Sequence, residues 1–285
     1  MTPEQYCQDK TAKSGSSFYY SFLFLPSHKR LAITALYAFC REVDDVVDEC
    51  TDIEIARTKL AWWRNEIDNL FNDNPQHPVT NALLEPTKDF NLPREHFYEI
   101  LDGMEMDLDY SSYGSFKNLS LYCHRVASIV GLMAAEIFGY KNRNTLKFAH
   151  HLGMAFQLTN ILRDVREDFS RNRLYIPLDE LDKFGVSVSD IESFKTSSNI
   201  QALFKFQAQR ARQYYDQAFE QLPNEDRFNQ LSGLIMANIY IATLEEIEND
   251  GFRVLQNRIK LTPLRKLWVA WKTVRQEKQR IKSLA

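Results

Sequence analysis

The chain of 285 residues is long enough to bury a sizeable core, and its 44% hydrophobic and 26% charged residues exclude collagen-like, coiled-coil and acidic-tail classes of protein. Nine glycines and nine prolines are roughly half the usual share, which argues against turn-rich β architectures and disordered linkers. The net charge of −3 gives no general reason to expect nucleic-acid binding, although residues 251–285 carry ten basic side chains against one acidic one.

A period near 3.6 residues dominates the hydrophobic pattern, so the sequence predicts a single all-α domain over residues 1–285. Start signals support several helices. Thr51 followed by Glu54 is a capping box, and Thr262-Pro263 supplies a cap and a first-turn proline for the last helix. The predicted helices cover residues 28–49, 52–72, 93–110, 119–140, 143–168, 197–221, 225–250 and 263–282.

The cysteines and the N-terminus indicate the cellular setting. The four cysteines, at positions 7, 40, 50 and 123, form no CxxC pair, so reduced thiols are the simplest interpretation. The first 17 residues are polar, and no apolar run approaches the ~18 residues needed to span a bilayer. The sequence therefore predicts a cytoplasmic protein, at most peripheral at the inner face of the membrane.

Two of the predicted helices carry a polar stripe in an otherwise apolar setting. Both stripes have the spacing of residues that share one helix face. The first stripe comprises Tyr37, Arg41, Asp44 and Asp48, and the second comprises Gly153, Gln157, Asn160, Asp164 and Asp168. A single DxxxD is more often a solvated surface than a metal site. Two such stripes on helices too apolar to be mostly exposed favour a site between facing helices of a bundle.

The chemistry that suits this pattern is the Mg²⁺-dependent ionisation of a diphosphate. Mg²⁺ prefers oxygen ligands and is commonly bound by one or two carboxylates together with phosphate oxygens. Two acidic stripes across a cleft could hold two or three ions around one diphosphate. Arg41 and Arg163 would then donate charge-assisted hydrogen bonds to the diphosphate oxygens.

Six motifs resemble the squalene/phytoene synthase family of head-to-head prenyl diphosphate synthases. They are SSFYYSFLFLP (16–26), ALYAFCREVDD (35–45), DDVVD (44–48), YCHRVASIVG (122–131), NILRDVRED (160–168) and RLYIP (173–177). The resemblance covers nearly the whole chain and is strongest to bacterial presqualene diphosphate synthases of the hopanoid pathway. It implies the isoprenoid synthase fold, an all-α bundle around a central apolar cavity.

The resemblance also implies roles for individual residues. Asp44, Asp48, Asp164 and Asp168 would bind Mg²⁺ and serve catalysis, with Asn160 as a further oxygen ligand. Side chains at family positions that face the diphosphate are Tyr37, Arg41, Gln157, Arg163, Tyr240 and Arg258. The family's diphosphate loop is matched by Ser14, Gly15, Ser16, Ser17 and Phe18. Several family members have His-Ser-Lys-Ser in this loop, so a basic contact is missing here and we expect backbone N–H groups to bind the phosphate.

Tyr122 and Asp45 need separate interpretations. A lone tyrosine on an apolar helix is usually a core residue with a satisfied hydroxyl, but the family position of Tyr122 lies beside the reacting carbons. A phenol of pKa ~10 is a poor base, so the released diphosphate could take the proton with Tyr122 relaying it. Asp45 lies about 100° from the first stripe, which gives it a supporting role.

The predicted activity is the Mg²⁺-dependent condensation of two farnesyl diphosphates to presqualene diphosphate. The alternatives are a squalene synthase using NADPH, a phytoene or dehydrosqualene synthase, and a non-catalytic helical assembly protein. The chain has no GxGxxG motif, and we do not expect NADPH to be a cofactor, although squalene synthases in the family lack that motif too. Enzymes further along the squalene pathway are candidate partners.

The last helix places Leu264, Leu267, Trp268 and Trp271 on one face with basic side chains around them. Packing against the rest of the protein is the default interpretation of this face. A peripheral contact with a membrane surface is the alternative.

Overall fold

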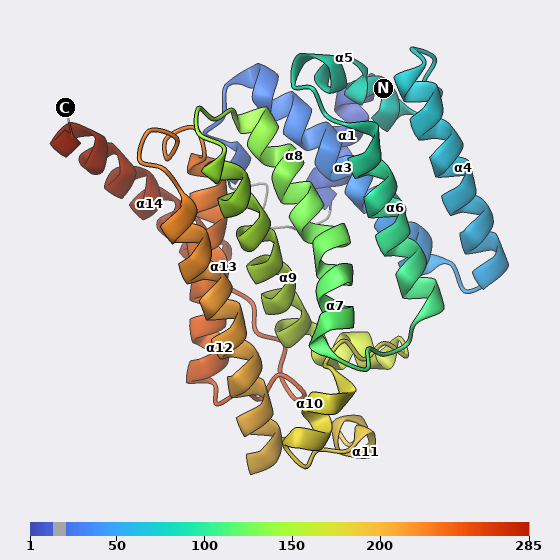
Figure 1. Ribbon diagram of the computed structural model, residues 1–285, viewed down its shortest axis with the longest axis vertical. Helices are drawn as coiled ribbons and strands as arrows, with labels where there is room; N and C mark the ends of the chain where they lie inside the picture. Colours follow the sequence, from blue (N-terminus) through green and yellow to red (C-terminus); the bar gives the residue numbers. More distant parts are fainter. Residues whose placement is uncertain (14–20, 285) are drawn as a thin grey trace.

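The computed structural model describes residues 1–13 and 21–284, and the all-α prediction is confirmed (Figure 1). Within these residues the β-structure is limited to an isolated bridge between Ser112 and Leu174. The helices are α1 (Pro3–Lys13), α3 (Ser27–Glu49), α4 (Ile53–Phe71), α5 (Pro78–Asp89), α6 (Arg94–Asp109), α7 (Phe116–Cys123), the π-helical turn η1 (His124–Ser128), α8 (Ile129–Phe138), α9 (Asn144–Ser170), α10 (Leu178–Lys183), α11 (Val188–Glu192), α12 (Ser198–Gln221), α13 (Leu231–Asn249) and α14 (Pro263–Leu284).

The predicted helices correspond to α3, α4, α6, the run α7–η1–α8, α9, α12, α13 and α14. The sequence analysis missed α1, α5, α10 and α11, three of which are 11 residues long or shorter. The fourth, α5, carries Pro86 in its interior and starts at Pro78, in the segment between the predicted helices 52–72 and 93–110. His77 caps this helix by accepting a hydrogen bond from the Val79 amide.

The caps differ in part from the prediction. Asp52, and not Thr51, caps α4, because its carboxylate accepts hydrogen bonds from the Glu54 and Ile55 amides at 2.9 and 3.3 Å. Thr262 does cap α14, since the Arg265 amide donates to its hydroxyl at 3.3 Å.

Helix α13 begins six residues later than predicted. The preceding turn contains the fully buried Asp226, whose carboxylate accepts hydrogen bonds from the amides of Lys141 and Asn142 and from the Thr145 hydroxyl. The turn is therefore held against the start of α9, and α13 begins only after it.

Glycine lets the middle of the bundle pack closely. A Cβ on Gly153 of α9 would lie 2.5 Å from the Ser128 Cα, and one on Gly131 of α8 would lie 2.7 Å from the Ala149 carbonyl oxygen. The backbones of η1 and α8 therefore approach α9 directly. This close packing explains why the second polar stripe has a glycine at position 153. Gly153 contributes no side chain to the site.

Two apolar cores divide the molecule. The first lies mainly among α1 and α3–α6, with α8 closing it. The second lies among α7, α9, α12, α13 and the start of α14. Figure 1 shows α9 running between α8 and the pair α12 and α13. A cavity of about 750 Å³ lies between the two cores, and both contribute to its walls.

One segment corrects the prediction that no apolar run approaches membrane-spanning length. The continuous helical run Phe116–Phe138 is long and apolar enough to cross a membrane by length and composition alone. In this fold 44% of the apolar 18-residue stretch within this run is buried. Tyr122, Val126 and Phe138 of the same run line the central cavity, so it has a role inside the bundle.

Candidate active site

The cavity has a polar end and an apolar end, both built by the same helices. Along α9, apolar side chains line the cavity near Phe148, and carboxylates line it near Asp168. These two positions are 20 residues apart, which corresponds to roughly 30 Å at 1.5 Å per residue. Helix α3 follows the same order, from Ile33 to Asp48. The arrangement suits a ligand with an anionic head and a long apolar tail.

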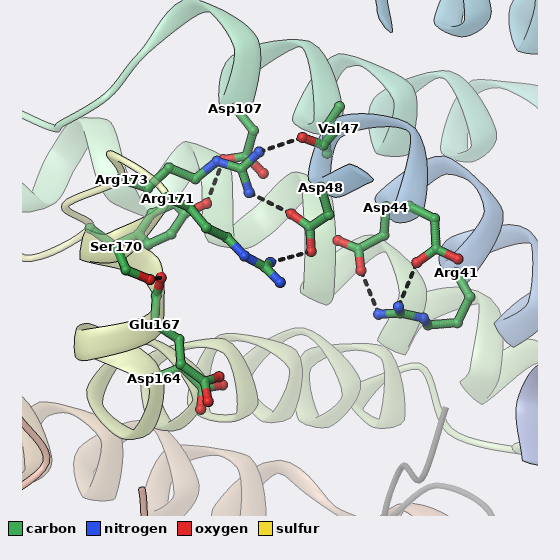
Figure 2. Close-up of polar contacts among 12 residues, drawn as sticks. Arg41, Asp44, Val47, Asp48, Asp107, Asp164, Glu167, Ser170, Arg171 and Arg173 are labelled. Atoms are coloured by element: carbon green, nitrogen blue, oxygen red, sulfur yellow. Dashed lines mark hydrogen bonds and ion pairs between the residues drawn. The ribbon is translucent and has the colours of Figure 1, made fainter. Parts of the chain in front are cut away.

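The first polar stripe lies at the polar end of α3 as predicted. Arg41 donates to Asp44 at 2.5 Å and to Asp45 at 2.6 Å (Figure 2). Asp45 also pairs with Lys10 of α1 at 2.8 Å, and it is absent from the cavity lining. Asp44 and Asp48 both line the cavity. Asp45 therefore holds Arg41 in place, which agrees with the supporting role expected for it.

The second stripe lies across the cavity on α9. Asp164 accepts hydrogen bonds from Arg163 at 2.5 and 2.9 Å, and Arg258 approaches the same carboxylate at 3.1 Å. Arg258 also pairs with Glu167 at 2.5 Å. The guanidinium of Arg163 in turn interacts with the Tyr240 hydroxyl. Two arginines therefore contact the second stripe, one from α9 and one from the segment before α14.

Two arginines that the sequence analysis missed connect the end of α9 to the first polar stripe on α3. Arg171 and Arg173 follow the end of α9, and each donates to the Asp48 carboxylate at 2.6 Å (Figure 2). Arg173 also donates to the Val47 carbonyl at 2.8 Å. Both arginines line the cavity, so its polar end holds five arginines altogether. They are Arg41, Arg163, Arg171, Arg173 and Arg258.

A buried network links Tyr122 to a carboxylate that the sequence analysis also missed. Tyr122 and Tyr175 donate hydrogen bonds to the two oxygens of Asp107, at 2.9 and 2.7 Å, and their own hydroxyl oxygens lie 3.3 Å apart. The two rings stack with centroids 5.1 Å apart. All three side chains line the cavity. Tyr122 is therefore both the buried, satisfied tyrosine of the default interpretation and a cavity residue.

The carboxylates of the site are electrostatically strained when no cation is present. Burial, together with repulsion from Asp48, raises the pKa of Asp44 to about 7, although Arg41 opposes the shift. Burial and repulsion from Asp164 raise the pKa of Asp168 to about 8. Burial also raises the pKa of Asp107 to about 6, against the effect of Arg173 and the two tyrosines. Several like charges facing one cavity are the environment that a bound cation would relieve.

The donor atoms fit a hard divalent cation. The amide oxygen Oδ1 of Asn160 is buried and has no hydrogen-bond partner among the described residues. All candidate ligands are oxygens, the type that Mg²⁺ prefers. Within the described part of the chain, no three His, Cys, Asp or Glu side chains converge closely enough to hold a metal ion. A cation here would have to complete its coordination with ligand phosphate oxygens and water.

The structure brings together all of the predicted site residues that it describes. The following line one cavity: Tyr37, Arg41, Asp44, Asp48, Tyr122, Gln157, Asn160, Arg163, Asp164, Asp168, Tyr240 and Arg258. The predicted diphosphate loop, Ser14–Phe18, lies outside the described residues. All four cysteines are free, as expected.

These features are those of a helical enzyme that binds isoprenoid diphosphates, and the comparisons with known proteins agree. The squalene/phytoene synthase family model matches residues 11–265, so the chain belongs to this family, whose members are prenyltransferases. A crystal structure of a dehydrosqualene synthase with a bound ligand superposes with a TM-score of 0.88 at 28% identity, covering 99% of this chain and 97% of that one.

Two curated relatives carry different product names. A presqualene diphosphate synthase from Sinorhizobium fredii is 38% identical over 253 residues, covering 88% of this chain and 90% of that protein. A phytoene synthase from Mycobacterium tuberculosis is 36% identical over 263 residues, covering 91% and 86%. The family is therefore established, and both product classes are represented among its similar members.

Proposed function

We propose that the chain condenses two farnesyl diphosphates head to head into presqualene diphosphate, with Mg²⁺ bound at the polar end of the cavity. The observation that carries the proposal is the two-ended cavity, with five arginines and the acidic stripes at one end and apolar walls along the rest. The similarity to the presqualene diphosphate synthase from Sinorhizobium fredii supports the choice of product. A cytoplasmic location, supported by the four free cysteines, belongs to the same proposal.

Diphosphate binding is assigned to the polar end of the cavity. Asp44, Asp48, Asp164 and Asp168 would hold two or three Mg²⁺ ions, with the Asn160 amide oxygen as an additional ligand. Bound Mg²⁺ would neutralise charge on the diphosphate leaving group. Arg41, Arg163 and Arg258, now paired with carboxylates, would donate to phosphate oxygens. Gln157, Tyr37 and Tyr240 complete this lining.

The bond changes take place beside Tyr122. The donor C1–O bond breaks, and diphosphate leaves with the electron pair. The C2=C3 π electrons of the acceptor then form a bond to donor C1, and loss of a proton from that carbon closes the cyclopropane. The surrounding apolar walls exclude water from the carbocation. The Tyr122 hydroxyl donates its hydrogen to Asp107, so the Tyr122 oxygen can accept the departing proton as its own hydrogen moves to the Asp107 carboxylate, and diphosphate is the final proton acceptor.

Product analysis tests the proposal. Purified protein is incubated with farnesyl diphosphate and Mg²⁺, with and without NADPH, and separately with geranylgeranyl diphosphate. A cyclopropyl diphosphate whose yield is unchanged by NADPH is the expected result. Squalene formed only with NADPH would instead indicate a complete squalene synthase. Turnover of geranylgeranyl diphosphate alone would indicate phytoene synthesis, which the relative from Mycobacterium tuberculosis favours.

Two aspartate variants test the assignment of the metal ligands. Asp48→Asn and Asp168→Asn should each lower turnover at least about 100-fold, because each removes a charge from the stripes that face the diphosphate. Glu49→Gln is the matched control, since Glu49 is an exposed carboxylate next to Asp48 and does not line the cavity. If both aspartate variants keep the turnover of the control, the carboxylates do not bind the metal and the assignment is wrong.

A further inference from the structure

The outer face of α14 carries large apolar side chains in water. Leu264 is 79% exposed, Leu267 45%, and Trp268 and Trp271 55% each. The opposite face of the helix packs on α13: Val269 and Ala270 are buried, and Asn238 donates to the Thr273 hydroxyl at 3.0 Å. Packing against the protein therefore accounts for one face of α14 and leaves the face with both tryptophans uncovered by the described residues.

The charge on the outer face of α14 has one sign. The Lys272 ammonium lies 5.1 Å from the ring centre of Trp268, and the Arg275 guanidinium lies 5.5 Å from that of Trp271. Further exposed basic side chains follow toward the C-terminal end at positions 278, 280 and 282. The single acidic residue of the helix, Glu277, is buried and paired with Arg227 at 2.6 Å. No carboxylate on α14 is therefore left to balance the exposed cations.

We propose that this face of α14, with Leu264, Leu267, Trp268 and Trp271 as its apolar part, docks on the surface of an anionic lipid bilayer. An amphipathic helix with aromatic and leucine side chains beside lysine and arginine lies in the plane of the membrane interface. Tryptophan is favoured at that depth because its ring is apolar and its N–H remains in reach of water. The cations complement phosphate head groups. The C-terminal turns of α14 also extend beyond the other helices, where a flat surface can reach them (Figure 1).

The docking face lies next to the polar end of the cavity. Residues 258–261 line that end, and α14 begins at Pro263. Lys266, one helical turn into α14, also lines the cavity. Docking would thus place the polar end of the cavity close to the bilayer, into which a long apolar product could pass. This consequence for product transfer rests on the proposed function, whereas the docking itself rests on α14 alone.

Vesicle flotation without substrate tests the docking. The full chain is mixed with vesicles of phosphatidylcholine or of equimolar phosphatidylcholine and phosphatidylglycerol, at low and high salt. We expect binding to the anionic vesicles only, weakened by salt. Trp268→Ala with Trp271→Ala should weaken binding at least tenfold. Lys272→Glu with Lys278→Glu should weaken it by at least tenfold at low salt, since each basic side chain near the surface contributes about fivefold.

Matched controls come from helices other than α14. Trp62→Ala removes a tryptophan of α4 that is 46% exposed, and Lys59→Glu with Lys147→Glu reverses two exposed lysines outside α14. Both controls should float like the wild type. Equal binding to both vesicle types, or equal losses in the controls, would overturn the proposal. A chain that is dimeric in sedimentation, becomes monomeric in Trp268→Ala with Trp271→Ala and binds no vesicle would also overturn it, in favour of self-association.

A separate turnover assay with dispersed substrate distinguishes this proposal from the proposed function. The α14 variants should keep wild-type turnover there, because none of the altered side chains lines the cavity. Vesicle binding by a chain that forms no prenyl product would support the docking and contradict the proposed function. Turnover by a chain that does not bind anionic vesicles would contradict the docking only.

Discussion

A single carboxylate, that of Asp107, determines the direction in which the Tyr122 hydroxyl donates its hydrogen. Because Asp107 accepts hydrogen bonds from both Tyr122 and Tyr175, each phenol commits its hydrogen to that carboxylate and keeps its lone pairs for other contacts. Burial and the neighbouring Asp107 raise the pKa of Tyr122 well above its usual value, so the ring stays neutral near pH 7. In the proposed reaction Asp107 is thus a positioning residue, which would act through Tyr122.

Replacing Asp107 with asparagine tests this role. The amide has one acceptor and one donor group, so one of the two tyrosine hydrogen bonds must reverse its direction. We expect kcat to fall about 100-fold, within the range of a lost proton-transfer contact, with KM for farnesyl diphosphate nearly unchanged. Steady-state kinetics measures both values, and Glu105→Gln on the same helix is the control. A kcat within threefold of wild type would show that Asp107 has a structural role only.

Sequence reasoning found the residues whose spacing is local and missed those that only the tertiary fold brings together. Asp44 and Asp48 share one helix face, so their spacing reveals them. Asp107 stands on α6, far in sequence from both tyrosines it contacts. In the sequence, Asp107 is only a carboxylate on the inner side of an amphipathic helix, and no characteristic spacing links it to Tyr122 or Tyr175. Arg171 and Arg173 lie in a turn, where no periodicity applies.

At the scale of helices, the sequence indicated the eight long elements and located their ends less well. Long amphipathic patterns give a strong periodic signal, whereas α10 and α11 are only six and five residues long. The observed N-cap of α4 is Asp52, one residue after the predicted Thr51. The two residues are adjacent, and aspartate caps a helix at least as well as threonine. The π-helical turn in the predicted helix 119–140 depends on packing against α9 and has no local signature.

Two glycines of the bundle should respond to alanine in opposite directions. At Gly153 the new Cβ would lie 2.5 Å from the Ser128 backbone, so α9 and η1 must move apart. At Gly233 of α13 the nearest atoms lie at 3.6 Å, an ordinary contact, and the helix gains from alanine. We expect Gly153→Ala to lower Tm by roughly 3–8 °C and Gly233→Ala to raise it by roughly 1–3 °C.

Thermal unfolding followed by circular dichroism measures both changes. The π-helical turn contributes Val126 and Ala127 to the cavity wall, so Gly153→Ala should also reduce turnover. A Gly153→Ala protein as stable as Gly233→Ala would mean that η1 and α9 do not pack as closely as the structure describes.

For the whole molecule, we expect the acidic stripes to make the free energy of unfolding depend on pH and on Mg²⁺ together. In the absence of metal the pKa values of Asp44 and Asp168 are raised to about 7 and about 8, mainly by burial and then by neighbouring aspartates. An unfolded aspartate has a pKa near 3.9. Between about pH 4 and pH 8 the folded protein therefore binds more protons than the unfolded chain, and these two residues lower its stability as pH rises.

Bound Mg²⁺ should remove this penalty where the carboxylates are ionised. We expect Mg²⁺ to raise Tm clearly at pH 8 and little at pH 5.5, because a protonated carboxyl is a poor metal ligand. Thermal scans at both values, with and without Mg²⁺, measure the difference. Asp44→Asn with Asp168→Asn is the comparison, since it should abolish the Mg²⁺ effect and make the metal-free protein less sensitive to pH over this range. An equal rise in Tm at both pH values, or a rise that survives in the double variant, would place Mg²⁺ away from the two stripes and contradict the role given to the polar end of the cavity.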